Sequence, residues 1–214
     1  MTKKTMKNKH NNMTNITRTI LTALIIMLAA TAARAAKVDT LSVYSQKMKR
    51  SLSTIVYTPD AAGEAKYPVI YLLHGYSGNS TTWPGITDVA RLADTYRTII
   101  VCPDGQNSWY VDSPVDPSMQ FETFISKELP EYIDAHYPTY ARRELRAITG
   151  LSMGGHGAMW NGLQHPDVFG NIGTTSGCMD ICQYPNCWQI EKVLGNKFQN
   201  ETVWKSHSVY YSLD

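Results

Sequence analysis

The sequence predicts an α/β protein whose sheet is mostly parallel and carries helices on both faces. Apolar runs of strand length alternate with segments of helical length along most of the chain. Several of these runs are apolar at successive positions, which is typical of parallel strands buried on both faces. Polar and glycine-rich turns follow them, so we expect any functional site at the carboxyl edge of the sheet.

Three strands and a helix are expected in the first half of the chain. Segments 38–45 and 52–59 are rich in β-branched and aromatic residues, and a turn-rich connection at 59–68 follows them. Segment 69–75 is a continuous apolar run that ends in glycine. Segment 87–96 has apolar residues at helical spacing. This order predicts two strands followed by the first crossover unit of a parallel sheet.

The second half continues the alternation of strands and helices. We expect a strand at 98–105, a helix at 121–137 that its internal proline bends or divides, and a strand at 141–150. A helix at 153–165 follows and is closed by the next residue, a proline. Segment 169–177 is expected to be another buried strand.

Residues 1–35 have the pattern of a secretory signal peptide. A basic stretch without acidic residues precedes the apolar run 20–30, and Ala33 and Ala35 form a small-x-small cleavage site. The apolar run is shorter than the roughly 20 residues that span a bilayer, so no stable membrane anchor is expected. We therefore predict a secreted or periplasmic protein whose remaining domain covers residues 36–214.

The charge balance argues against a nucleic-acid partner. Removing the leader takes away six of the 20 basic side chains and none of the 18 acidic ones, which leaves a formal charge of about −4. Proteins that bind nucleic acids need a clustered cationic surface. With 43% hydrophobic residues in 214, the chain is long enough for one core and one domain.

The stretch Gly150-Leu151-Ser152-Met153-Gly154 matches the pattern G-x-S-x-G between an expected strand and an expected helix. A turn this sharp strains the serine backbone and leaves room only for small neighbours, which Gly150 and Gly154 provide. We predict Ser152 to be a nucleophile at a helix N-terminus. The alternative is a glycine-rich turn with an incidental serine.

Two backbone N–H groups are candidates for an oxyanion hole. The N–H of Met153 follows the serine at the helix N-terminus, where free donors favour negative charge. The stretch His74–Gly78 ends an earlier strand, and the N–H of Tyr76 is the expected second donor. His74 either orients this loop or acts as a general base, and we favour the first role.

Four stretches in this order resemble the esterase D family of α/β-hydrolases, which includes feruloyl and acetylxylan esterases, S-formylglutathione hydrolases and mycolyltransferases. The resemblance extends over residues 38–214. The stretches are YLLHGYSGNSTTW (71–83), CPDGQNSWYVDSP (102–114), ETFISKELPEYIDAHYP (122–138) and GLSMGGHGAMWNGLQHPDVFG (150–170).

The resemblance implies the α/β-hydrolase fold and serine acyl-ester chemistry. Ser152 would attack the ester carbonyl, the N–H groups of Met153 and Tyr76 would hold the oxyanion, and water would release the acyl-enzyme.

The resemblance also implies a substrate pocket beside the segment DGQNSWY, with Gln106, Ser108 and Trp109 as lining residues and His74 nearby. The alternative for Trp109 is an ordinary core position. Glu122 is expected to be a structural cap or ion-pair partner rather than an acid catalyst.

A complete triad is not evident. The expected order is Ser, then an acid, then His, and only His156, His165 and His207 follow the serine. The first two belong to the helix that starts at the serine, and His207 matches a non-catalytic position of the family. Asp180 is the one plausible acid, although the family usually places its acid after a later strand. We therefore expect the chain to stop before the last strands of the sheet.

The four cysteines leave their pairing open. Cys102 ends a strand, whereas Cys178, Cys182 and Cys187 share one loop, and export would permit a disulfide among these three. No CxxC pair or suitably spaced histidine favours zinc. The sequence therefore implies neither a metal nor an organic cofactor.

These observations predict a serine carboxylesterase that acts on an acylated carbohydrate, of the acetyl or feruloyl type, or on another small ester. The rival hypothesis is a non-catalytic or decayed module that uses the same cleft to bind a glycan or a protein. The intact serine turn argues against the rival, since a binding module has no need of a strained, exposed serine.

Overall fold

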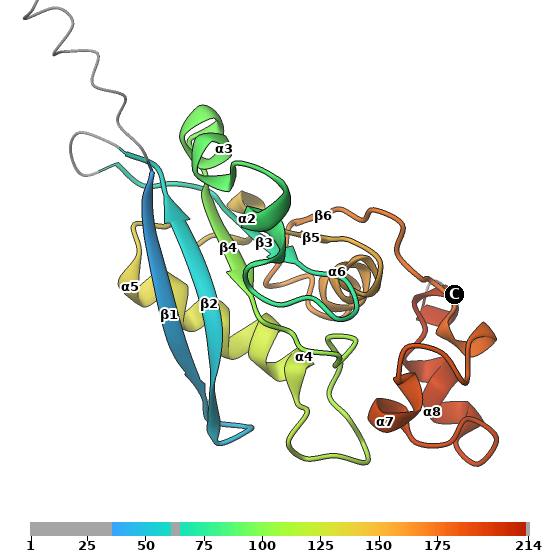
Figure 1. Cartoon of the computed structure of the whole chain (residues 1–214). Coiled ribbons are helices and arrows are strands. Elements are labelled where there is room, and N and C mark those ends of the chain that lie inside the picture. Colours follow the sequence, from blue (N-terminus) through green and yellow to red (C-terminus); the bar gives the residue numbers. More distant parts are fainter. Residues whose placement is uncertain (1–35, 61–64, 213–214) are drawn as a thin grey trace, which may run out of the picture. The chain divides into compact units, whose positions relative to one another are not determined.

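A computed structural model describes residues 36–60 and 65–212, and the predicted signal peptide lies outside these residues. Six strands form one sheet in the order β1-β2-β4-β3-β5-β6 (Figure 1). Strands β4, β3, β5 and β6 run parallel, and the hairpin of β1 and β2 joins them antiparallel. The strands are β1 Lys37–Ser45, β2 Arg50–Thr58, β3 Val69–Leu73, β4 Ile99–Pro103, β5 Arg146–Gly150 and β6 Asn171–Ile172.

Helices cover both faces of the sheet, as the sequence predicted. Along β4, Ile99 and Val101 pack into the large core cluster that also holds residues of α5 and α6, while Ile100 and Cys102 pack into a second cluster with α3. The α-helices are α2 Thr82–Ile86, α3 Val89–Tyr96, α4 Phe121–Thr123, α5 Leu129–His136, α6 Met153–Gln164, α7 Ile190–Leu194 and α8 Glu201–Ser206. None of the helices in this part of the chain is long and apolar enough to cross a membrane.

The predicted helix at 121–137 is helical from 121 to 136 but contains a π-helical turn. α4 runs into the π-helix η1 Phe124–Glu128 and then into α5. Pro130 lies in the first turn of α5. Proline has no N–H for the carbonyl four residues earlier, and its ring would collide with that carbonyl. A wider turn just before the proline removes this conflict.

Two predicted strands are shorter than expected. The strand expected at 141–150 begins only at Arg146, because the 3₁₀-helix η2 Arg143–Leu145 precedes it. The strand expected at 169–177 is reduced to β6, two exposed residues, so the prediction of a long buried strand was wrong. Its chain still follows β5, since the N–H groups of Gly173 and Thr175 donate to Ile148 and Gly150. The segment is mostly small and polar residues, which offer little apolar surface to bury.

The segment after β6 contains elements that the sequence analysis did not predict. The 3₁₀-helices η3 Ile181–Gln183 and η4 Val209–Ser212 flank the short helices α7 and α8. Their buried side chains Ile190, Val193, Leu194, Trp204 and Val209 belong to the large core cluster. This packing brings the segment against α6, which η4 contacts directly.

We predict that Gly157→Ala destabilises the protein, because a Cβ at Gly157 would collide with the ring of the buried Tyr110. The expected loss is about 1–3 kcal/mol of unfolding free energy, measured by urea denaturation. The control is Gly85→Ala in α2, where a Cβ meets no atom within 4 Å. Equal stability of the two variants would contradict the packing described here.

Candidate active site

Ser152 occupies a strained turn between β5 and α6. Its φ of 56° and ψ of −114° lie in a region that residues other than glycine rarely adopt. A Cβ at Gly150 would collide with the carbonyl of Gly154, and one at Gly154 would lie 2.5 Å from the carbonyl oxygens of Leu73 and His74. The strand, sharp turn and helix predicted from the sequence are therefore present, and both glycines are required by close backbone contacts.

The Ser152 side chain lies at a pocket of about 260 Å³. Its hydroxyl does not cap α6 and makes no hydrogen bond to another described residue. Nine uncharged residues line the pocket, and four of them are aromatic. They are Tyr76, Trp109, Ser152, Met153, Ser176, Gly177, Cys178, Tyr184 and Trp188.

Tyr76 and Met153, the two predicted oxyanion donors, both line this pocket. Met153 is the first residue of α6, so its N–H has no partner inside the helix. Neither its N–H nor that of Tyr76 donates to any group in the described part of the chain. Two unengaged backbone donors therefore share a pocket with a serine hydroxyl, which is the arrangement that stabilises a tetrahedral oxyanion.

His74 is buried and has no ring nitrogen free for proton transfer. Its Nδ1–H donates to the Gly75 carbonyl at 2.7 Å, and its Nε2 accepts from the Gly105 N–H at 2.9 Å. The carbonyl of His74 itself accepts from the hydroxyl of Tyr110. These bonds support a role in orienting the loop and not the alternative of a general base. With 1% of its surface exposed, His74 does not line the pocket.

The segment 104–112 contributes only one of its three predicted pocket residues. Trp109 lines the pocket and is also 98% buried, so its two alternative roles coincide. Gln106 instead accepts from the Arg50 guanidinium. Ser108 is fully buried, and its hydroxyl donates to the Gly105 carbonyl. Neither Gln106 nor Ser108 borders the pocket.

Asp180 caps a 3₁₀-helix and does not contact a histidine. Its carboxylate accepts from the Cys182 N–H, the Gln183 amide and the Ser208 hydroxyl. These contacts are structural, and none of them leads toward Ser152.

The three histidines after Ser152 are also engaged elsewhere. His156 is buried between backbone carbonyls, His165 pairs with Glu122, and His207 contacts the Val203 carbonyl. Glu122 also accepts from the Trp160 indole, which agrees with its predicted structural role. Across residues 36–60 and 65–212, no histidine or carboxylate is hydrogen-bonded to the Ser152 hydroxyl.

Sequence reasoning missed the pocket wall formed by residues 176–188. This segment was interpreted only through its cysteines and Asp180, whereas Trp188 places its ring beside Trp109 and Tyr184 packs against Trp188. The Trp109 indole donates to the Trp188 carbonyl at 3.2 Å and so links segment 104–112 to the wall at 176–188. All four cysteines are free thiols. The described residues contain no cluster of three potential metal ligands.

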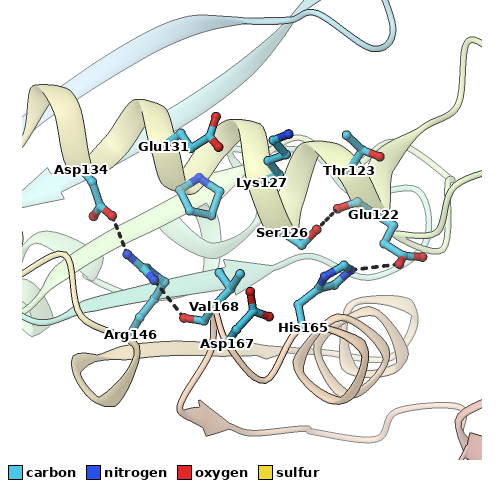
Figure 2. Close-up of a pocket in the computed structure, with 11 residues that line it drawn as sticks. Glu122, Thr123, Ser126, Lys127, Glu131, Asp134, Arg146, His165, Asp167 and Val168 are labelled. Atoms are coloured by element: carbon cyan, nitrogen blue, oxygen red, sulfur yellow. Dashed lines mark hydrogen bonds and ion pairs between the residues drawn. The ribbon is translucent and has the colours of Figure 1, made fainter.

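A second and larger cavity, of about 490 Å³, lies between the helical segment 121–136 and the chain at 165–168. Figure 2 shows an ion pair near each end, His165 with Glu122 and Arg146 with Asp134. The Arg146 guanidinium also donates to the Val168 carbonyl. Its lining includes neither Ser152 nor an oxyanion donor, so we interpret the cavity as a crevice braced by ion pairs.

The Esterase family model matches residues 45–212 of this chain. The chain belongs to the Esterase family. This result confirms the family that the sequence motifs predicted, and the match covers the strained serine, both predicted oxyanion donors and the aromatic wall.

Individual relatives agree with this family. The chain is 30% identical over 150 residues to an acetyl esterase of Caldicellulosiruptor saccharolyticus, a match that covers 66% of the chain and 56% of the relative. The chain therefore spans little more than half the length of that curated relative. A solved ferulic acid esterase is 30% identical, with a TM-score of 0.66 over 81% of this chain and 71% of that one.

The fold is that of the α/β-hydrolases. The fluorophosphonate-binding serine hydrolase F of Staphylococcus aureus superimposes with a TM-score of 0.73 at 22% identity, over 85% of this chain and 73% of that one. The mostly parallel sheet of this Esterase-family chain, with helices on both faces, agrees with the superposition.

His156 is a fully buried titratable group near this site. Its ring lies between Trp109 and Trp160, and its nitrogens face the carbonyls of Trp109 and His207 at 3.3 and 3.0 Å. Burial lowers the pKa of His156 to about 4. The folded state therefore holds a neutral imidazole at pH values where an unfolded histidine, with a pKa near 6.5, is already protonated.

We predict a pH-dependent stability that originates from His156. The pKa of His156 is lower in the folded state than in the unfolded state, so its contribution to the free energy of unfolding is complete above pH ~6.5. This contribution is lost as the pH falls toward 4, and the total loss is about 3 kcal/mol. Urea unfolding at pH 7.5, 6 and 5 should show this fall, and His156→Gln should make it shallower. The exposed His136→Gln is the control. An unchanged slope in His156→Gln would contradict the prediction.

Proposed function

We propose that this chain carries the nucleophile and the oxyanion hole of a serine esterase that cleaves acyl esters of carbohydrates. The observation that carries the proposal is the strained Ser152, whose hydroxyl shares a pocket with the unengaged N–H groups of Met153 and Tyr76. Strain at one serine with free donors beside it has a catalytic explanation and no evident structural one.

The proposed reaction proceeds through an acyl-enzyme. The Ser152 Oγ attacks the ester carbonyl carbon, and the carbonyl electrons move to oxygen, where the two N–H groups stabilise the negative charge. Collapse of this intermediate expels the alcohol, and water then attacks the acyl-serine to release the acid. The serine proton requires a base, and the described residues bring no histidine to Ser152.

The pocket favours an uncharged acyl group. No charged residue lines it, and placing an ionised group against its aromatic walls would leave that charge without a partner. Acetyl and feruloyl groups are uncharged, and they are named in two similar proteins, the acetyl esterase and the ferulic acid esterase. The predicted signal peptide supports a secreted or periplasmic enzyme that meets acylated polysaccharide outside the cytoplasm.

We predict that a fluorophosphonate probe labels the full chain at Ser152. Labelling should disappear in Ser152→Ala and persist in Ser176→Ala, which removes a second serine hydroxyl from the same pocket. Mass spectrometry of the labelled peptide gives the position.

The outcome separates the two hypotheses for this site. Labelling that persists in Ser152→Ala would remove Ser152 as the nucleophile. If protein that circular dichroism shows to be folded is not labelled, the rival hypothesis of a binding module is favoured. The absence of a histidine contact at Ser152 among the described residues supports that rival.

A further inference from the structure

We propose that Asn107 is a positioning residue that holds the Tyr76 N–H in the oxyanion hole. The proposal rests on the proposed esterase function, because the Tyr76 N–H has a catalytic role only there. Asn107 lies between Gln106 and Ser108, the two expected pocket residues that do not border the pocket. Its side-chain Oδ1 accepts from the Ser77 N–H at 2.9 Å.

The Tyr76 N–H lies in the first of the two peptide planes that flank the Tyr76 Cα, and the second plane attaches the turn to a neighbouring segment. The first plane contains the Gly75 carbonyl and the Tyr76 N–H, which point in opposite directions in a trans peptide. The Gly75 carbonyl accepts from the His74 ring and from the Gly78 N–H. These two bonds direct the Tyr76 N–H to the other side of the turn.

The second plane contains the Ser77 N–H, and Asn107 is its partner. Ser77 has a φ of 63°, a conformation that favours glycine at the third position of a type II turn. Rotation of this one peptide plane converts a type II turn into a type I turn and removes the positive φ. The bond to Asn107 opposes that rotation and fixes the turn that carries Tyr76 against segment 104–112.

Asn107 can serve as a fixed anchor because its own segment is held from several sides. The Gly105 N–H donates to His74, and the Gln106 N–H donates to the Asp104 carboxylate at 2.8 Å. Deeper in the protein, the Asn161 amide donates to the Tyr110 carbonyl at 2.9 Å. Segment 104–112 therefore holds the turn at two points, through the bond of the Gly105 N–H to the His74 ring and through the side-chain Oδ1 of Asn107.

The Ser77–Asn107 bond is exposed, so its loss should affect the reaction more than the stability. When Asn107 is replaced by Ala, water can satisfy the Ser77 N–H, but the turn that carries Tyr76 loses an attachment and can move. Misplacement of an oxyanion donor lowers the rate of the chemical step while substrate binding is maintained. This consequence distinguishes a positioning residue from a merely structural one.

The test compares the second-order rate of fluorophosphonate labelling of the full chain in four variants. We expect Asn107→Ala to label about 10- to 100-fold more slowly than the unmodified chain, with an unchanged urea midpoint. Asn107→Asp retains the acceptor oxygen, so its labelling rate should fall less than that of Asn107→Ala. Asn186→Ala, an exposed loop asparagine, is the matched control. Ser77→Gly combined with Asn107→Ala should recover part of the rate, because glycine accepts a positive φ.

A structural readout keeps the test independent of the proposed function. The amide resonances of Tyr76 and Ser77 should shift in the ¹⁵N–¹H spectrum of Asn107→Ala, and the Ser77 amide should exchange faster with solvent. If both resonances stay in place, or if Asn107→Ala labels as fast as the unmodified chain, the positioning role is overturned. If the unmodified chain does not label at all, the proposed function fails, and the two resonances still decide whether Asn107 holds the turn.

Discussion

The active-site architecture depends on the close approach of the backbone at three points, the end of β3, the end of β5 and the start of α6. Gly154 meets the carbonyl oxygens of Leu73 and His74, and Gly150 meets Gly154 itself. No side chain fits between these segments. This contact sets the distance between the loop that holds Tyr76 and the turn that holds Ser152, and an oxyanion hole built from two separate segments requires that distance to be constant.

Contacts between segment 104–112 and α6 hold this arrangement in place. Trp109 and Tyr110 are consecutive aromatic residues with φ values of 57° and 58°, a conformation that is costly for bulky side chains. Their carbonyls face the buried His156 and Asn161 of α6. The strain in segment 104–112 is thus offset by buried polar contacts to the helix that starts at the serine. The helix α6 therefore orients both Ser152 and the pocket wall at Trp109.

Local sequence patterns predicted the features that depend on local backbone geometry. The motif around Ser152 specified a sharp turn, and the structure has it with positive φ. The apolar runs specified the inner strands, because burial on both faces removes the usual alternation of polar residues. The same pattern led to a wrong prediction at segment 169–177. This segment pairs with β5 for part of its length but presents too little apolar surface to form a buried strand.

The sequence by itself determined the family, the elements of the sheet and its helices, and the sharp turn at Ser152, because each of these is indicated by motifs of residues close together in the chain. Only the tertiary structure decided which side chains surround them. It placed Tyr184 and Trp188 opposite Trp109, withdrew Ser108 into the core and set Asn107 against the Ser77 N–H. The contacts of Asn107 with Ser77 and of Trp109 with Trp188 join residues 30 and 79 positions apart, and their geometry follows from packing, which no local pattern records.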